Sequence, residues 1–284
     1  MDDAQIEKLL ALRYEIDEVD NKMHDLLMHR AYLASEIGKL KKESGVVPDI
    51  LHPVREAQIV RRLWNRHNGE LDKRVVSQIW REIISACVNV QKPMNVAVYM
   101  PRSDCKNMAL ARHYFGSCTA IVPCRSESLV LKELSEGDAN IGVFSLGGVG
   151  EVCWWYSIAQ ENKRTFSVFA QLPFAENIPD LSGRTAYAVG RVAPEAGEDM
   201  NSLLFVETDG MLSLSTLDLV LKAAGVPTLA VCDTYSPDLT RKAYLIEVSG
   251  FFAENDQRLS AVADKEKERI VMMRVIGNYP VPLK

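Results

Sequence analysis

The sequence predicts a multidomain protein in which an all-helical region over residues 1–92 precedes two modules that contain strands, over 94–200 and 201–284. Three observations lead to this prediction. Apolar residues before residue 93 recur at helical spacing, and no strand-like run stands among them. Short β-type runs then alternate with helical segments. The last module reads strand, helix, strand, strand, helix, strand.

Composition narrows the classes of protein to consider. The chain has 284 residues, of which 47% are hydrophobic and 25% charged, as in an ordinary globular protein of two or three domains. The net charge of −5 and the lack of a basic stripe argue against a general nucleic-acid or anionic-membrane binder. No apolar run is long enough for a membrane span, and MDDAQIEKLL lacks the plan of a signal peptide. The 6 scattered cysteines indicate reduced thiols in a cytoplasmic protein and no metal site.

The first helix is predicted to be unusually long. Asp2 or Asp3 can cap its start, and Lys39, Lys41 and Lys42 fill its last turn before Gly45. About forty residues make a rod of about 60 Å, roughly twice the width of a small domain. Such a rod needs a second chain to cover it, so we expect an intertwined homodimer.

Two shorter helices follow within the helical region. The first starts near Pro53, a residue suited to the first helical turn, and runs to about His67. After the turn NGEL, Asp72 caps a third helix through VVSQIWREIISACVNVQ, which Pro93 stops.

Strand signals begin at residue 94. The runs NVAVYM, TAIVP, NIGVFSL, TFSVFAQLPF and TAYAVGRV alternate with helical segments and indicate an α/β module. The runs NSLLFVET, TLAVCDTY, KAYLIEVSG and IVMMRVIGNYP, with helical segments after the first and the third, then give the order of a ferredoxin-like module.

The apolar seam of the first helix contains cations. It comprises Ile6, Leu9, Arg13, Ile16, Asp20, Met23, Leu27, Arg30, Ala34, Ile37 and Lys41. An unpaired cation in a core costs several kcal/mol, so each needs a partner or a function. One interpretation is an anion-binding site. The other is a coiled-coil seam softened by ion pairs with Asp20 or Glu36, and spacing alone leaves both open.

Three stretches resemble the all-helical chorismate mutases: LLALRYEIDEVDNKMHDLLMHRAYLASEIGKLK, PVREAQIVRRL and IWREIISACVNVQ. The resemblance covers all three helices and their spacing. The remainder resembles a shortened, degenerate form of the prephenate dehydratase and ACT regulatory segments of bifunctional enzymes. That resemblance rests on VAVYMPRSDCKNMALARHYFGS, YLIEVSGFF and VMMRVIGNYP.

The resemblance implies the rearrangement of chorismate to prephenate in phenylalanine and tyrosine biosynthesis. Chorismate is a small dianion with two carboxylates and an ether bridge. Its rearrangement is pericyclic, so it requires no nucleophile, metal or cofactor. The enzyme holds a compact, chair-like form and stabilises negative charge on the ether oxygen, which calls for fixed cations and hydrogen-bond donors in a dry bundle.

The resemblance also assigns roles to cations at matching positions. Arg30 and Arg13 would clamp the carboxylates, with Arg13 reaching in from the partner chain of a dimer. Lys41 would donate to the ether oxygen and to a carboxylate. Arg55 would lie beside a carboxylate or support the site, although a single helical arginine is more commonly solvated.

Four uncharged or acidic positions complete the implied site. Glu56 would accept a hydrogen bond from the ring hydroxyl, or stay protonated and donate one. Gln91 would give a second hydrogen bond to the ether oxygen. His52 stands where an acidic residue is frequent and Cys87 where a hydroxyl is frequent, both at the edge of the site. On their residue types alone, His52 reads as a turn residue before Pro53, and Cys87 as core lining.

The second half departs from the dehydratase pattern. The family's Thr-Arg-Phe motif falls on Arg184, Thr185 and Ala186 in SGRTAYAVGR, the loop MPRSDCKNM is not rich in glycine and serine, and the segment after GVFSLGG is too short for a second lobe. We therefore expect no dehydratase activity. In the ACT-like part Gly210 and the turn CDTYSP stand where the family binds an amino acid, so an aromatic amino-acid effector and a purely structural dimerising module both remain open.

Two other functions compete with a chorismate mutase. An isochorismate pyruvate lyase uses a similar helical scaffold and a similar set of cations. A non-catalytic regulatory protein would bind aromatic metabolites through the ACT-like end or dock on another enzyme of the pathway.

Overall fold

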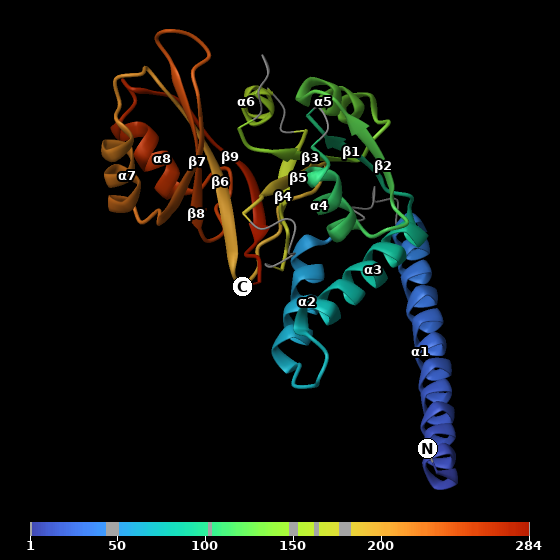
Figure 1. The fold of residues 1–284 in the computed structure, drawn as a ribbon. Helices are drawn as coiled ribbons and strands as arrows, with labels where there is room; N and C mark the ends of the chain where they lie inside the picture. The colour runs from blue at the N-terminus through green and yellow to red at the C-terminus, as the bar shows by residue number, and fades with distance from the viewer. Residues whose placement is uncertain are drawn as a thin grey trace.

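A computed structural model describes residues 2–43, 51–101, 104–147, 153–161, 165–175 and 183–283. Within these ranges, three N-terminal helices precede a nine-stranded sheet with further helices on its faces (Figure 1). The order of helices and strands is the one that the sequence predicts.

Helix α1 (Asp3–Glu43) is the long rod expected from the sequence. Asp2 Oδ1 accepts a hydrogen bond from the backbone N–H of Gln5 at 2.8 Å, and Gln5 Oε1 accepts from the N–H of Asp2 at 3.1 Å. This reciprocal capping box confirms Asp2 as the cap. Residues 2–29 are exposed, and most of α1 projects beyond the rest of the chain (Figure 1). Only Ala34 and Gly38 are buried.

Helices α2 (Pro53–Arg66) and α3 (Lys73–Gln91) confirm the two shorter predicted helices. Pro53 occupies the first turn of α2, where a missing N–H is harmless. Asp72 caps α3 by accepting from the N–H of Arg74 at 2.8 Å. The last turns of α1 pack against α3, which also contacts α2.

The first strand-containing segment begins with three parallel strands in the order β2-β1-β3. The next pairings in the sheet are antiparallel: β5 pairs with β3 on one side and with β4 on the other. The elements are β1 (Asn95–Tyr99), α4 (Lys106–Phe115), β2 (Ala120–Cys124), α5 (Glu127–Glu136), β3 (Ile141–Ser145), α6 (Trp154–Gln160), β4 (Ser167–Leu172) and β5 (Ala186–Gly190).

The last segment has the predicted βαββαβ order, with its strands arranged as β9-β6-β8-β7 and all neighbours antiparallel. Helices α7 and α8 cover one face of this part, with a core of their own. The elements are β6 (Met200–Thr208), α7 (Leu214–Ala223), β7 (Thr228–Tyr235), β8 (Lys242–Ser249), α8 (Gln257–Lys265) and β9 (Ile270–Pro280).

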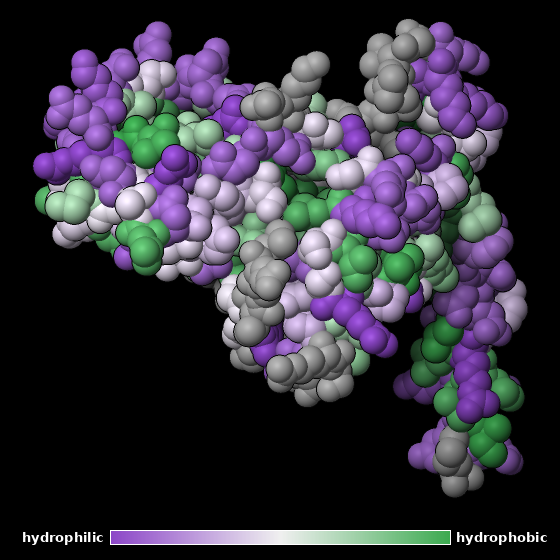
Figure 2. Space-filling model, turned by 90° about the horizontal axis from the view of Figure 1, so that it is seen from above, coloured by the Kyte–Doolittle hydropathy of each residue, from purple (hydrophilic) through white to green (hydrophobic). Residues whose placement is uncertain are grey.

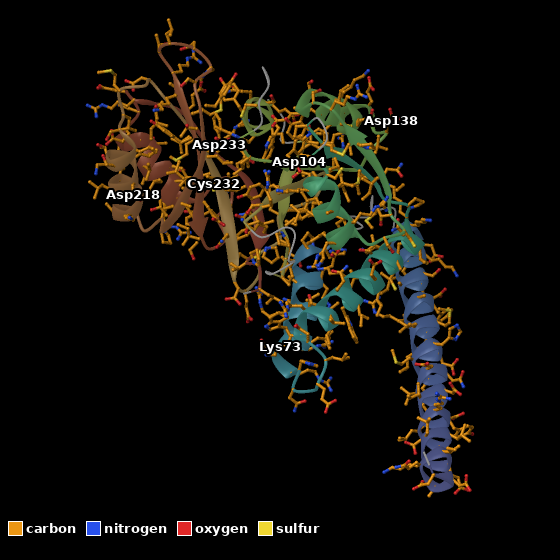
Figure 3. The ribbon with its side chains drawn as sticks, in the orientation of Figure 1. Lys73, Asp104, Asp138, Asp218, Cys232 and Asp233 are labelled. Carbon is orange, nitrogen blue, oxygen red and sulfur yellow. The ribbon has the colours of Figure 1, made fainter. Side chains whose placement is uncertain are left out.

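One sheet runs through both segments, joined where β4 pairs with β9 at Val168 and Gly277. A Cβ on Gly277 would collide with the backbone of Val168, whose Cα lies only 2.8 Å from that position. Helix α6 strengthens the join from one face, because Trp155 Nε1 donates to Asp233 of β7 at 3.1 Å (Figure 3 labels Asp233). Because one continuous sheet spans both segments, the structure does not test the predicted domain boundary at residue 200, which remains a prediction.

Helices α2 and α3 share a core with the sheet. Their buried side chains join residues of β1, β3, α4 and β4 in a single cluster that includes Ala57, Val60, Ile84, Val88, Val96, Leu110, Val143, Phe169 and Leu172. The α/β half thus fixes where α2 and α3 lie, whereas α1 depends on its contact with α3.

Two remaining sequence expectations concern the cysteines and the membrane. The six cysteines are thiols, and none of them forms a disulfide bond. Across the part of the chain that the structure describes, no helix combines the length and the apolar character required to cross a bilayer.

Candidate active site

The crossing of α1 and α3 determines the position of Gln91. A Cβ on buried Gly38 would lie 3.2 Å from Cγ of Gln91, so glycine lets the two helices approach closely. The side-chain amide of Gln91 donates to the carbonyl of Cys87, one turn earlier, at 3.4 Å. Gln91 therefore lies half-buried against the last turns of α1.

Two of the predicted cations share the face of α1 that meets the other helices. Arg30 and Lys41 lie about three turns apart, which returns both to one side of the helix. Both are half-buried, unlike most of α1. Arg30 donates from its guanidinium to the carbonyl of Ile83 on α3 at 3.4 Å. Lys41 Nζ lies 2.7 Å from Nε2 of His52, the residue before α2.

Glu56 supplies a buried carboxyl from α2. Its side chain accepts a hydrogen bond from the guanidinium of Arg81 on α3 at 3.2 Å. Burial raises the pKa of Glu56, while the positive charges of Arg81 and Arg30 act in the opposite direction. Cations from α1 and α3 thus act on this one carboxyl.

Arg13 lies outside this arrangement in a single chain. It is exposed on the projecting part of α1, seventeen residues before Arg30, which corresponds to about 25 Å of helix. In the described residues, neither Arg13 nor Arg30 forms an ion pair with Asp20 or Glu36, and Glu36 pairs instead with Lys39 at 2.7 Å. This distribution weighs against an ion-paired coiled-coil seam.

The three other candidate residues differ in their surroundings. Arg55 is exposed on α2. His52 is exposed too, but its contact with Lys41 makes it a neighbour of the cations. Cys87 is buried and lines an apolar groove of about 450 Å³ between α1, α3 and the segment 115–119. Arg30 and Lys41 do not line this groove, so the groove does not bring Cys87 together with these cations.

Arg81 is a buried charged residue that the sequence interpretation missed. It lies on the inward face of α3 together with Ser77, Ile84, Ser85 and Val88. A cation at helical spacing among buried positions is the signal that identified Arg30 and Lys41 on the first helix. The same reasoning applied to IWREIIS would have singled out Arg81.

The features expected of a degenerate second half are only partly described. Arg184 forms an ion pair with Asp104 at 3.1 Å, across the carboxyl ends of the strands (Figure 3 labels Asp104). Ala186 starts β5 and is buried. Gly210 adopts a φ of 78°, and the adjacent Met211 is 81% exposed. Residues 102–103, 148–152 and 176–182 lie outside the described ranges, so the proposed loop and short lobe are described only in part.

Comparison with known proteins gives the helical region a family. The family described as chorismate mutase type II matches residues 12–92. A chorismate mutase of Methanocaldococcus jannaschii is 34% identical over 90 residues, which cover 31% of this chain and 87% of that protein.

Bifunctional proteins match a longer part of the chain. A chorismate mutase/prephenate dehydratase of Pseudomonas aeruginosa is 31% identical over 143 residues, 49% of this chain and 39% of that protein. One of Neisseria gonorrhoeae is 24% identical over 262 residues, 83% of this chain and 71% of that protein. The alignment with the Pseudomonas protein thus spans about two fifths of its length. A helical mutase region followed by an α/β dehydratase-like part is the organisation of this chain.

Proposed function

We propose that this chain, which belongs to the chorismate mutase family, converts chorismate to prephenate at a site on its three N-terminal helices. The observation that carries the proposal is the convergence of four candidate residues from three helices. Arg30 of α1 acts on the charge of Glu56 of α2, Lys41 of α1 contacts His52 at the start of α2, and Gln91 of α3 lies against Gly38 of α1.

The cations perform the binding. Arg30 pairs with one substrate carboxylate, and its bond to the carbonyl of Ile83 holds the guanidinium in place before the substrate arrives. Lys41 donates to the second carboxylate and to the ether oxygen. Because the two cations lie on one face of the helix, they hold the dianion from the same side in a single orientation.

The uncharged contacts act on the breaking bond and on the ring. Gln91 gives the ether oxygen a second donor, so the charge that develops there meets one fixed cation and one fixed dipole in a partly dry site. Glu56 contacts the ring hydroxyl. Arg55 and His52 act from the edge of the site, His52 by orienting Lys41.

A homodimer supplies Arg13. Within one chain Arg13 is too far along α1 to reach Arg30, and the exposed half of the helix presents apolar residues that a second α1 would cover. The partner's rod brings its own Arg13 to the first chain's site. Figure 2 shows apolar side chains along the projecting helix, as this arrangement requires.

The second half has no catalytic role in this proposal. Arg184, Thr185 and Ala186 replace the dehydratase motif, so prephenate leaves unchanged. We place the protein in the cytoplasm, in phenylalanine and tyrosine biosynthesis. An aromatic amino-acid effector at the ACT-like end stays a prediction, which calorimetry of the whole chain with phenylalanine and with tyrosine would test.

The direct experiment offers the purified full-length protein chorismate and isochorismate in parallel and identifies the products. A chorismate mutase consumes chorismate and forms prephenate. Release of pyruvate and salicylate from isochorismate, without prephenate from chorismate, would indicate the lyase. If neither compound turns over while aromatic amino acids bind, the chain is a regulatory protein.

A further inference from the structure

The guanidinium of Arg81 is buried, and its one ion pair does not provide partners for all of its N–H groups. Its side chain is 3% exposed, and the guanidinium pairs with Glu56 at 3.2 Å. Its Nε and its second terminal nitrogen have no hydrogen-bond partner among the described residues. Each such group costs free energy in a core, so the position of this cation needs an explanation other than hydrogen-bond satisfaction.

Two aromatic rings account for where the guanidinium lies. Its carbon lies 4.2 Å from the ring centroid of Tyr114 and 4.5 Å from that of Phe174. Both rings are buried. Tyr114 belongs to the last turn of α4, and Phe174 follows β4, so both come from the α/β half of the chain. A planar cation held against two aromatic faces loses most of its freedom to turn.

Stability alone is a poor reason for such a pair. Replacing a buried ion pair with apolar residues of similar volume is commonly neutral or stabilising, whereas removing one partner leaves the other charge uncompensated. The other member here is Glu56, which the proposed function places against the substrate. The pair therefore lies between the reacting helices and the second half.

We propose that Arg81 is a positioning residue that fixes the carboxyl of Glu56 in the mutase site, and that Tyr114 and Phe174 of the α/β half hold Arg81 in place. This inference rests on the proposed function. It gives the non-catalytic half a part in the reaction, since two of its aromatic residues keep the site in order.

The charged and titratable groups around Glu56 determine what each substitution does. Arg81 faces it from α3, Arg30 from α1 and His52 from the start of α2, while the phenol of Tyr114 lies close enough for the two groups to influence each other. Loss of Arg81 removes the cation with the largest influence on the carboxyl. Removing an opposite charge at this range should raise the pKa of the Glu56 carboxyl by about one unit or more. This shift is expected whether the protonated or the ionised form of Glu56 is the active one.

The test is the pH profile of kcat/KM for chorismate in the full-length protein. Glu56→Gln identifies the limb that belongs to Glu56, because the amide does not titrate. In Arg81→Met we expect that limb to move up by about one pH unit or more. In Phe174→Leu it should move the same way by less. The matched control is Phe252→Leu. The ring of Phe252 is also buried, and its centroid lies 4.2 Å from the guanidinium carbon of Arg258 on α8. This substitution should leave the Glu56 limb in place.

The outcomes separate this inference from the proposed function. Absence of turnover in the wild type overturns both. Two results in an active wild type would overturn the inference alone. One is that the Glu56 limb of the pH profile stays in place in Arg81→Met. The other is that Glu56→Gln removes no limb from the profile. If Arg81→Met does not fold, Phe174→Leu decides the matter, since it keeps both charges. A limb that moves equally in Phe252→Leu would mean a general loss of packing and would also overturn it.

Discussion

Glu56 and Arg81 are the two buried acidic or basic side chains in the described part of the helical region. Each makes the burial of the other tolerable, although two nitrogens of Arg81 have no hydrogen-bond partner among the described residues. Arg30 and Lys41 are less buried and stay available at the edge of the same environment. The difference in burial suits the proposed roles, in which the half-buried cations bind the substrate carboxylates, Glu56 contacts the ring hydroxyl and Arg81 holds Glu56 in position.

The two half-buried cations give the first prediction. Arg30→Ala and Lys41→Ala should each lower kcat/KM for chorismate by about 10²–10³-fold, the usual effect of losing one donor that stabilises developing charge. Far-ultraviolet circular dichroism should be unchanged, because neither side chain belongs to the core. Lys39→Ala is the control, since Lys39 is an exposed lysine of the same helix whose partner is Glu36. Near-wild-type rates in both variants would contradict the site.

A second prediction concerns Glu127, a buried residue at the start of α5. Its carboxylate accepts from the N–H of Trp154 at 2.9 Å, and burial raises its pKa from 4.5 to about 7. Between these values the folded protein keeps a proton that the unfolded chain has released, so the free energy of unfolding falls as pH rises. This contribution is present in full below pH 4.5 and is lost as pH rises through about 7.

Glu127→Gln should remove that pH dependence. The loss in the wild type is on the order of 3 kcal/mol, so the variant should gain stability relative to the wild type between pH 5 and pH 8. Urea unfolding at the two pH values measures the difference, with the exposed Glu136→Gln of the same helix as the control. If the free energies of unfolding of the wild type and of the variant differ by the same amount at both pH values, the interpretation of Glu127 is wrong.

Single residues also show what the sequence could predict. Arg30, Lys41, Glu56 and Gln91 could be predicted as site residues because their spacing along the first three helices is local and the family pattern is specific. Arg81 was not, since the two rings that hold it come from residues 114 and 174, far away in the sequence. Nothing in a helical periodicity says which distant segment will cover a buried charge.

At the scale of the element, local signals located the helices and strands. Caps, prolines and apolar periods placed the first three helices within a residue or two of their observed ends, and the strand runs fell on the observed strands. Helix α1 differs from the other helices, because the rest of the chain leaves most of its apolar side chains exposed. Its exposed apolar side chains include Ile6, Leu9, Ile16, Met23, Leu27 and Ile37 of the predicted seam. Figure 3 shows the side chains of its projecting length surrounded by open space.

The third prediction tests whether α1 works across a dimer. Arg13→Ala and Lys41→Ala should each be nearly inactive alone. After the two are unfolded and refolded together, half of the dimers are hybrids. One of the two sites in each hybrid then has its own Lys41 and an intact Arg13 from the partner, so about a quarter of wild-type activity should return, as two-fold symmetry requires.

The control for this mixing experiment is a blend of the two folded variants without exchange. No gain of activity in the refolded mixture, although sedimentation shows dimers, would show that Arg13 does not act on the partner's site. An active Arg13→Ala protein would place Arg13 outside the site. A refolded protein that stays monomeric would contradict the need for a second rod.

At the scale of the whole molecule, the sheet is one body although the sequence suggested separate modules. Periodicity and turn signals identify strands but do not say which strands from different segments pair. The join between β4 and β9 depends on a close approach at Gly277, which has no signature apart from a glycine within a strand. Because α2 and α3 pack on the same sheet, this join also supports the helices of the site.

The fourth prediction follows from that join. Gly277→Ala should destabilise the protein by about 3 kcal/mol or more, since its Cβ would meet the backbone of Val168, which cannot turn aside as a side chain can. Urea unfolding measures the change. Gly69→Ala, in the exposed loop before α3, is the control and should stay within about 0.5 kcal/mol of the wild type. A stable Gly277→Ala protein would show that β4 and β9 are not tightly joined.

The most direct test of the whole interpretation is a crystal structure of the full-length protein with a bicyclic dicarboxylate that mimics the rearranging substrate. We expect Arg30, Lys41 and the partner's rod to enclose the ligand, with both of its carboxylates bound by cations and Gln91 at the ether oxygen. A ligand found elsewhere, with Arg30 and Lys41 facing bulk water or neutralised by neighbouring acids, would contradict it.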